Sequence, residues 1–357
     1  MIRVLALTRY SRSAASSRQR FLVFRDYLSS NDIELIERPF FEDDYIVHLN
    51  TGNRLNYLKL IGDYLRRIRA LASHPDYDVV WIEKEALPYL PAAVENFLLR
   101  QSRVLLDLDD AWHLRYNNST LTRLGLARKM QTIACRASVL AVANEGLQQW
   151  SRDIGADESR IQLLPTGLDV AHYPVRPEPA GDFTLGWIGG PFTAPYLASI
   201  APPLRRLSNE GVRLLVVGET NPIPALAGVR IEQHAWSEAR EAELISACHV
   251  GLNPLPDDDW CRFKSGYKLI QYMAAGRAAV ASPVGANCWV QADFETGLFA
   301  STDEQWYSAI NRLRNDHELR SRLAIGGRRR AETVFSIEAL GQTLVQMIKA
   351  TAAAPRT

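Results

Sequence analysis

The sequence has little of what several protein classes require. It contains four cysteines and no Cys-x-x-Cys pair, so neither a zinc site nor a thioredoxin-like redox motif is indicated. No stretch reaches the ~18 consecutive apolar residues of a transmembrane helix. The first ten residues, MIRVLALTRY, lack the charged segment and long apolar run of a secretory signal, and we expect them to form a strand. These absences favour a cytoplasmic protein with reduced thiols.

An excess of either charge is also lacking. The 41 basic and 40 acidic residues leave a net charge of +1. Such a balance gives no general attraction to nucleic acid or to an anionic membrane, so we expect no nucleic-acid partner. Any anionic ligand must be bound by locally placed arginine and lysine side chains.

The dinucleotide-binding pattern Gly-x-Gly-x-x-Gly is missing as well. No expected strand is followed by it, and the glycines of residues 186–190 have the wrong spacing. A nicotinamide-dependent dehydrogenase is another enzyme class that two parallel sheets would suit, and the missing pattern argues against it.

Short apolar runs alternate with helical patterns over most of the chain. In residues 1–170, runs such as 77–82 and 104–108 are separated by segments with apolar residues at helical spacing, among them 55–72 and 121–136. Strands that alternate with helices of ten or more residues indicate a parallel sheet covered on both faces. At about 150 residues per domain, the chain is long enough for two such domains.

A proline-rich segment, residues 171–182, separates two such series and is predicted to be a linker. The alternation continues over 183–335, and an amphipathic helix over 336–351 is expected to pack back on the N-terminal domain. The predicted fold class is therefore α/β, with two Rossmann-like, doubly wound parallel-sheet domains facing a cleft. Ligands of such sheets bind beyond the carboxyl ends of the strands, so both domains would offer loops to that cleft.

Residues 257–276 (DDDWCRFKSGYKLIQYMAAG) concentrate side chains suited to an anionic ligand. Ser265 is the expected N-cap of a helix, and Gly276 stands where a C-terminal glycine is expected. Lys268 and Gln271 are three residues apart and share a face. The face expected to lie against the sheet carries Leu269, Ile270, Met273 and Ala274.

The start of this helix is the candidate phosphate site. A helix N-terminus exposes unpaired N–H groups and partial positive charge, which attract phosphate. Arg262, Lys264 and Lys268 add charge suited to a diphosphate, and Gln271 is one turn further, where it can hydrogen-bond a ribose hydroxyl. On spacing alone, an ordinary amphipathic helix with solvated lysines fits the segment equally well.

Residues 268–282 (KLIQYMAAGRAAVAS) closely resemble the signature K-x-x-E-Y-M-A-x-G-x-P-V-V-A-S of glycosyltransferase family 4, the retaining GT-B enzymes of glycosyl transferases group 1. The resemblance extends to 164–169 (LPTGLD), similar to the family's I-P-N-G-V-D, and to 186–190 (GWIGG), which resembles the opening of its C-terminal domain. It covers most of residues 160–345 and is weaker over residues 1–150.

The resemblance implies transfer of a sugar from a UDP or GDP sugar, with retention of configuration, to a glycan, a lipid-linked glycan or another hydroxyl acceptor. It places the donor on the C-terminal domain and the acceptor mostly on the N-terminal domain, in polysaccharide or glycoconjugate biosynthesis. No metal and no cofactor are expected, because basic residues and a helix N-terminus stabilise the departing diphosphate. The enzyme would be cytoplasmic or at the inner face of the membrane. For peripheral membrane contact, the candidates are Arg66, Arg67 and Arg69, which a solvated helix face explains as well.

The expected site residues follow from these motifs and from the polar side chains that end the predicted strands. The donor-binding set is Gly189, Gly190, Lys264, Ser265, Gly266, Tyr267, Lys268, Gln271 and Trp236. The catalytic set is Lys268, Arg262, Asp109 and His113. The acceptor-binding set is Glu83, Glu85, Asp107, Asp110 and Arg18.

Two departures from the family pattern stand at this site. Gln271 replaces the family's ribose-binding glutamate, and Phe263 stands where the family has its first glutamate. One of the acidic residues at 257–259 would substitute for that carboxylate, or these residues form an exposed acidic turn. The alternative function is accordingly a degenerate GT-B protein that binds nucleotide sugar or glycan without turnover.

Overall fold

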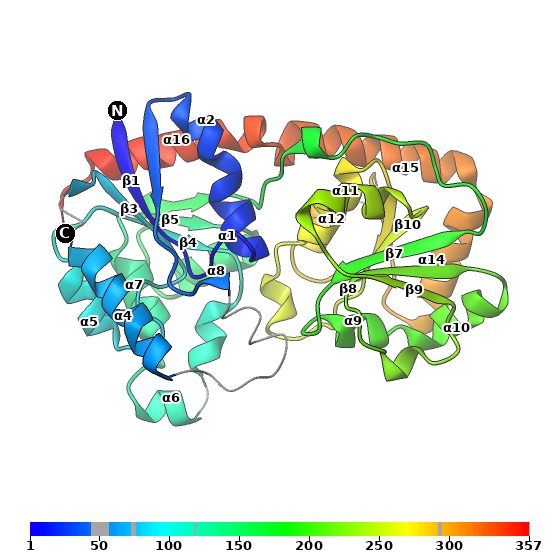
Figure 1. Ribbon diagram of the computed structural model, residues 1–357, viewed down its shortest axis with the longest axis horizontal. Coiled ribbons are helices and arrows are strands. Elements are labelled where there is room, and N and C mark those ends of the chain that lie inside the picture. The colour runs from blue at the N-terminus through cyan, green and yellow to red at the C-terminus, as the bar shows by residue number, and fades with distance from the viewer. Residues whose placement is uncertain (44–56, 73–75, 118, 292–294, 357) are drawn as a thin grey trace. The chain divides into compact units, whose positions relative to one another are not determined.

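The computed structural model describes residues 1–43, 57–72, 76–117, 119–291 and 295–356. The chain divides into two compact units (Figure 1). The first unit comprises residues 1–167, 263–265 and 337–357, and the second unit comprises residues 168–262 and 266–336. The segment expected to be a linker belongs to the second unit, and the C-terminal helix belongs to the first.

The first unit is built on a six-stranded sheet in the order β2-β1-β3-β4-β5-β6, with every neighbouring pair parallel. Its strands are β1 (Ile2–Leu7), β2 (Ile33–Glu37), β3 (Val79–Glu83), β4 (Val104–Leu108), β5 (Val139–Val142) and β6 (Ile161–Leu163). Its helices are α1 (Ala15–Arg20), α2 (Arg25–Ser29), α4 (Tyr57–Ala72), α5 (Ala92–Leu98), α6 (Ser119–Arg123), α7 (Lys129–Arg136), α8 (Glu145–Asp153) and α16 (Ile337–Ala353).

Both faces of this sheet are covered, as expected for parallel strands. One face carries Val4, Ala6 and Trp81, which belong to one apolar cluster with Phe21 and with residues of α2 and α16 (Figure 1). Ile82 and Leu106 lie on the opposite face and border residues of α5 and α7. Helix α16 begins at Ile337, whereas the last strand of this sheet ends at Leu163, so a segment distant in sequence completes the core of the first unit.

The helix predicted over 121–136 is divided in the structure. Helix α6 ends at Arg123 and α7 begins at Lys129. Gly125 lies between them with a φ of +75°, in the left-handed region that ends a right-handed helix. The apolar periodicity ran across this break because Leu126 and Met130 are both buried.

The second unit has its own six-stranded parallel sheet, in the order β12-β11-β10-β7-β8-β9. Its strands are β7 (Thr184–Gly189), β8 (Arg213–Gly218), β9 (Ile231–His234), β10 (Val250–Asn253), β11 (Ala278–Ala281) and β12 (Gly297–Phe299). Its helices are α9 (Ala194–Ala198), α10 (Ala201–Asn209), α11 (Glu238–Ser246), α12 (Tyr267–Ala274), α13 (Asn287–Val290), α14 (Asp303–Asn315) and α15 (His317–Arg330). The predicted pair of doubly wound parallel sheets is thus confirmed.

The side chains of β8 contribute to two apolar clusters, one on each face of the second sheet. Leu214 and Val216 face α10 and α14, whereas Leu215 and Val217 face α11 and α12. Alternate residues of a strand point to opposite faces, so an uninterrupted apolar run is what a sheet covered on both sides requires.

Arginines of α15 hold together the elements around α12. Arg328 donates from Nη1 to the carbonyl oxygens of Tyr173, at 2.6 Å, and of Ala274, the last residue of α12. Arg330 donates to the carbonyls of Trp289 and Val290 at the end of α13. These guanidinium groups satisfy helix-terminal carbonyls that have no partner within their own helices.

Among the described residues, no helix is both long and apolar enough to cross a membrane.

Two helical glycines of the first unit test how closely α16 is packed. A Cβ at Gly341 of α16 would lie 2.5–2.8 Å from ring atoms of Tyr27 in α2, whereas one at Gly62 of α4 would meet open space among the described residues. Gly62→Ala should raise the free energy of unfolding by up to ~1 kcal/mol through helix propensity. Gly341→Ala should lower it by ~1–2 kcal/mol, because overpacking outweighs the same gain. Urea unfolding measures both, and equal stabilisation by the two substitutions would contradict the close packing of α16.

Candidate functional site

The carboxyl ends of the strands in the second unit bring the donor-binding candidates to one edge of its sheet. Gly190 follows β7, Trp236 follows β9, and α12 follows β10 along the chain. Parallel strands end at the same edge, which is where ligands of doubly wound sheets bind. The predicted buried face of α12 is confirmed, since Leu269, Ile270, Met273 and Ala274 are all at most 1% exposed.

Gly266, not Ser265, is the N-cap of α12. Its φ of +68° lies in the left-handed region, and no side chain caps the helix. A side chain at this position would be strained, and its Cβ would also approach Val290 and Asn287 of α13 to 3.1–3.2 Å. Ser265 precedes the cap by one residue and belongs, with 263–264, to the first unit. The glycine therefore leaves the helix start without a side-chain acceptor on its N–H groups.

A buried amide pair supports the start of α12. Asn253 at the end of β10 donates to Asn287 Oδ1 at 3.0 Å, and Asn287 donates to the carbonyl of Ser282 at 3.0 Å. All three residues are buried. Sequence reasoning missed Asn253 and Asn287, because a single asparagine after a strand carries no distinctive spacing.

The predicted phosphate lysines lie on either side of this N-cap. Lys268 is in the first turn of α12, half-buried, with its ammonium 5.7 Å from the ring centre of Trp187 in β7. Lys264 is half-buried in the loop before the helix, and Tyr267, the first residue of α12, is half-buried as well. Two lysines near a helix N-terminus give this end of α12 a positive potential.

The glycine pair after β7 has two different environments. A Cβ at Gly189 would meet Thr193 Oγ1 at 2.5 Å and the ring of Trp187 at 2.6 Å, whereas one at Gly190 would meet open space among the described residues. Packing thus explains Gly189, and Gly190 is the member of the pair that leaves the backbone open to a ligand.

Arg262, predicted to bind phosphate, is held by the acidic turn before it. Its guanidinium donates to Asp257 at 2.7 Å and to Asp259 at 3.2 Å, and all three side chains are more than half exposed. Asp258 instead accepts from the backbone N–H of Cys261. Residues 257–259 therefore form an exposed acidic turn that compensates the charge of Arg262, and the role of Arg262 in binding phosphate stays a prediction.

Gln271 is buried and hydrogen-bonded within the second unit. Its Nε2 donates to the hydroxyl of Tyr173 at 3.4 Å, and that hydroxyl donates to Glu241 of α11. The other oxygen of Glu241 accepts from the indole N–H of Trp236, a predicted donor-site residue. Sequence reasoning missed Tyr173, which stands in the supposed linker, and Glu241, which looks like one of several acidic residues on an amphipathic helix.

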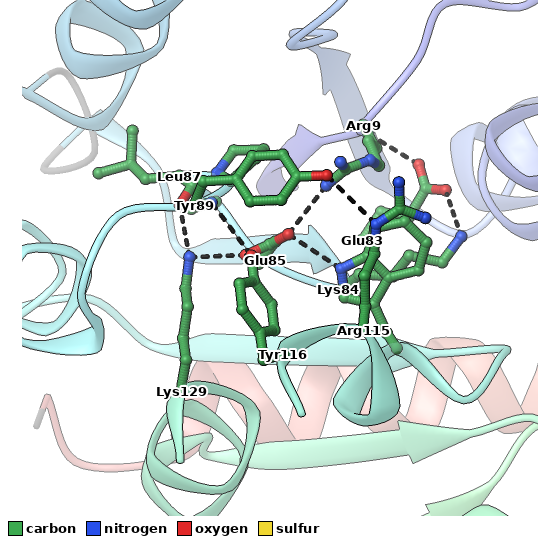
Figure 2. A network of polar contacts seen from close by, with 12 residues as sticks. Arg9, Glu83, Lys84, Glu85, Leu87, Tyr89, Arg115, Tyr116 and Lys129 are labelled. Atoms are coloured by element: carbon green, nitrogen blue, oxygen red, sulfur yellow. Dashed lines mark hydrogen bonds and ion pairs between the residues drawn. The ribbon is translucent and has the colours of Figure 1, made fainter. Parts of the chain in front are cut away.

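In the first unit, the two glutamates predicted to contact an acceptor are buried (Figure 2). Glu85 accepts from Arg9, Trp112, Tyr116 and Lys129 at 2.6–2.9 Å. The cations and hydrogen bonds around it lower its pKa, although burial acts in the opposite direction. This carboxylate is fully engaged inside the unit, and its assignment to acceptor binding stays a prediction.

Glu83 is engaged in the same way. Its Oε2 accepts from Ser17 Oγ and from the backbone N–H of Arg9, both at 2.8 Å. Its neighbour Lys84, with a φ of +64°, places its ammonium 3.0 Å from Asp109. A non-glycine residue in the left-handed region is strained, and here the buried ion pair holds it.

The aspartates after β4 differ in exposure. Asp107 is buried and paired with Arg20 at 2.8 Å, and burial raises its pKa to about 6. Its side chain is 1% exposed, and its assignment to acceptor binding stays a prediction. Asp109 is buried too, yet its ion pair with Lys84 outweighs burial and lowers its pKa. Asp110 is half-buried and is the most exposed of the three.

His113 and Arg18 are both held by neighbouring groups of the first unit. The His113 ring stacks on Trp150 with centroids 4.5 Å apart and meets Phe263 edge-on at 4.8 Å, and burial lowers its pKa to about 4. At neutral pH the imidazole is therefore uncharged. Arg18 is buried and donates to the carbonyl of Arg12.

Within the described residues, no three His, Cys, Asp or Glu side chains are grouped so that they could hold a metal ion.

The second unit matches a known family in sequence. Residues 185–316, less than half of the chain, match the family model described as "Glycosyl transferases group 1". This range contains β7, α11 and α12, and hence most of the donor-binding candidates. Comparison with curated proteins gave no significant sequence match.

Solved structures resemble the whole chain. HepE of Anabaena, in complex with UDP-glucose, has a TM-score of 0.74 and 14% identity, covering 98% of this chain and 100% of HepE. Sucrose-phosphate synthase of Thermosynechococcus elongatus has a TM-score of 0.72 and 14% identity, covering 98% of both chains. WaaG, a glycosyltransferase involved in lipopolysaccharide biosynthesis, has a TM-score of 0.68 and 15% identity, covering 97% and 99%. Such likeness at low identity establishes the fold, which is GT-B.

The buried network around Glu85 predicts a large difference between two glutamates of the first unit. Glu85→Gln leaves the buried cations Arg9 and Lys129 without their shared carboxylate and should cost ~3–5 kcal/mol of unfolding free energy. Glu34→Gln removes an exposed partner of Arg3 and should cost less than about 1 kcal/mol. Chemical unfolding of the two variants measures the difference, and a small loss for both would refute a structural role for Glu85.

Proposed function

We propose that this protein is a retaining glycosyltransferase that moves a sugar from a UDP or GDP sugar to a glycan, a glycolipid or another hydroxyl acceptor, in polysaccharide or glycoconjugate biosynthesis. One observation carries the proposal: α12 begins at the carboxyl edge of the second sheet, with an uncapped glycine N-terminus and Lys264 and Lys268 beside it. This is the arrangement that binds a diphosphate. It lies inside the range that matches the family model.

In the proposed reaction, the bond between the anomeric carbon of the donor and the diphosphate oxygen breaks. The acceptor hydroxyl oxygen bonds to that carbon from the same face, and its proton passes to the departing diphosphate. Lys268 and the N–H groups at the start of α12 would stabilise the charge that develops on the leaving group. The chain is hexosyltransferase-like in this scheme and needs no metal.

The similar solved structures support the donor class. HepE was solved with UDP, with UDP-glucose, and with UDP and glucose, and WaaG is described as acting in lipopolysaccharide biosynthesis. In the first unit, Asp110 is the most exposed of the predicted acceptor-binding carboxylates, so we assign it to the acceptor site.

A panel of nucleotide sugars tests the proposed function, with thermal stabilisation and slow hydrolysis to free sugar as readouts. Stabilisation by UDP or GDP sugars together with hydrolysis is the expected result. Binding without turnover on any acceptor would favour the degenerate, binding-only alternative. Stabilisation by NAD alone would overturn the proposal.

Lys268→Ala should weaken binding of the nucleoside diphosphate by ~1.5–3 kcal/mol, roughly a tenfold to 150-fold rise in Kd, because a charged hydrogen bond to phosphate is lost. Titration calorimetry with UDP and GDP measures this change. The exposed Lys349 of α16 provides the control, and Lys349→Ala should leave the affinity unchanged. An unchanged affinity in the Lys268 variant would remove its proposed role.

We further propose that α4 contacts the membrane at the inner face of the cytoplasmic membrane, where a lipid-linked acceptor would lie. Leu58, Ile61 and Leu65 are 81%, 57% and 52% exposed along one side of this helix. Arg69 extends the same side, whereas Arg67 is buried and Arg66 pairs with Asp63. An exposed apolar stripe next to a basic residue suits a membrane surface.

Co-sedimentation with vesicles that contain anionic lipid tests the α4 surface. Leu65→Glu should reduce vesicle binding about tenfold, since a buried leucine contributes ~1.5–3 kcal/mol. Ile325→Glu, at a similarly exposed apolar residue of α15 in the second unit, should have no effect. Equal binding by both variants would argue against this surface.

A further inference from the structure

A chain of buried and partly buried hydrogen bonds joins three separate segments of the second unit. It runs from Trp236, after β9, through Glu241 of α11 and Tyr173 to Gln271 of α12. Glu241, Tyr173 and Gln271 are at most 5% exposed. Tyr173 is fixed further by Arg328, which donates to its carbonyl oxygen. We name these four side chains, Trp236, Glu241, Tyr173 and Gln271, the relay.

The protons of the relay can be assigned from its chemistry. An indole N–H only donates, so Trp236 fixes one oxygen of Glu241 as an acceptor. The single proton of the Tyr173 hydroxyl goes to the other oxygen of Glu241. Burial and the nearby carboxylate raise the pKa of Tyr173, so this proton is retained. The phenolic oxygen can then only accept, and the group facing it from Gln271 must be the amide Nε2.

This assignment decides which atom Gln271 presents to a ligand. With Nε2 turned to Tyr173, the remaining atom of the amide is Oε1, a hydrogen-bond acceptor. Among the described residues, no group donates to Oε1. Oε1 is not one of the fully buried side-chain atoms that lack a hydrogen-bond partner, so it reaches the surface of the unit, where a ligand can supply an O–H group.

We propose that Glu241 and Tyr173 are positioning residues that lock the Gln271 amide with Oε1 facing the ligand, so that the site selects a nucleotide with ribose hydroxyls. This inference rests on the proposed function, which supplies a nucleoside diphosphate at α12. Glu241 carries the negative charge that residue 271 lacks. It orients the hydroxyl of Tyr173, and that hydroxyl in turn orients the amide of Gln271. The same carboxylate holds the indole of Trp236, so one residue orients two members of the predicted donor site.

The relay also explains why residue 271 is glutamine. A carboxylate at 271 would face the Tyr173 oxygen while the hydroxyl proton is bound to Glu241, leaving two acceptors in contact. Glutamine supplies the missing donor. Exchanging the two side chains, by Glu241→Gln together with Gln271→Glu, is equally consistent. The amide at position 241 would then donate to Tyr173, and the tyrosine hydroxyl would donate to the carboxylate at position 271. An amide paired with a carboxylate supplies the donor and the acceptor that the Tyr173 hydroxyl meets at these two positions.

The experiment compares dissociation constants for UDP and for its 2′-deoxy and 2′,3′-dideoxy analogues, and for the GDP series if the protein prefers guanine. The wild type should bind the ribonucleotide more tightly than the dideoxy analogue by about three- to tenfold, as for one neutral hydrogen bond. Glu241→Gln and Tyr173→Phe should each reduce this ratio to near one. The double variant Glu241→Gln with Gln271→Glu should restore it.

The control is Glu243→Gln, on the same helix, where the glutamate is 54% exposed and lies 3.8 Å from Arg240. It should keep the wild-type ratio. Because each ratio is measured on a single variant, partial unfolding of a variant cancels from it, and a purely structural role for Glu241 would lower both affinities equally. A wild-type ratio in Glu241→Gln, or no recovery in the double variant, overturns the relay alone. Failure of the wild type to bind any nucleoside diphosphate overturns the proposed function and the relay together.

Discussion

A carboxylate taken out of water at the edge of a sheet must be met by donors, and this constraint shapes both units. In the first unit, Glu85 accepts hydrogen bonds from two cations, an indole and a phenol on segments far apart in sequence. In the second, Glu241 gathers an indole and a phenol. An isolated buried charge would cost several kcal/mol, so the elements that carry its partners are fixed relative to one another.

The charged side chains at the carboxyl edges of the two sheets are paired differently. In the first unit, the buried carboxylates Glu83, Glu85 and Asp107 all form hydrogen bonds or ion pairs with other side chains of the same unit. In the second unit, the ammonium of Lys268 lies 5.7 Å from the ring centre of Trp187, and the acidic turn compensates Arg262. The result is a helix N-terminus with positive potential at an edge where a diphosphate can bind.

Periodicity was a good guide wherever burial alone decided the structure. Alternating apolar runs predicted both parallel sheets, and the spacing of Leu269, Ile270, Met273 and Ala274 predicted the buried face of α12. It failed where backbone geometry intervened. Gly125 divides the helix predicted over 121–136, and Gly266 takes the cap position expected for Ser265. A left-handed residue leaves no trace in an apolar pattern, because glycine is also common where nothing special occurs.

By itself, the sequence determined the two-sheet architecture and the segment that carries the lysines of α12, because each depends on side chains close together in the chain. Only the tertiary structure decided which polar residues are buried and hydrogen-bonded to other side chains of the protein. Glu241 lies 68 positions from Tyr173, and Gln271 lies 98 positions from it. Whether a glutamate faces a ligand or a buried tyrosine depends on how helices pack on the sheet, and that packing is set by contacts no local pattern records.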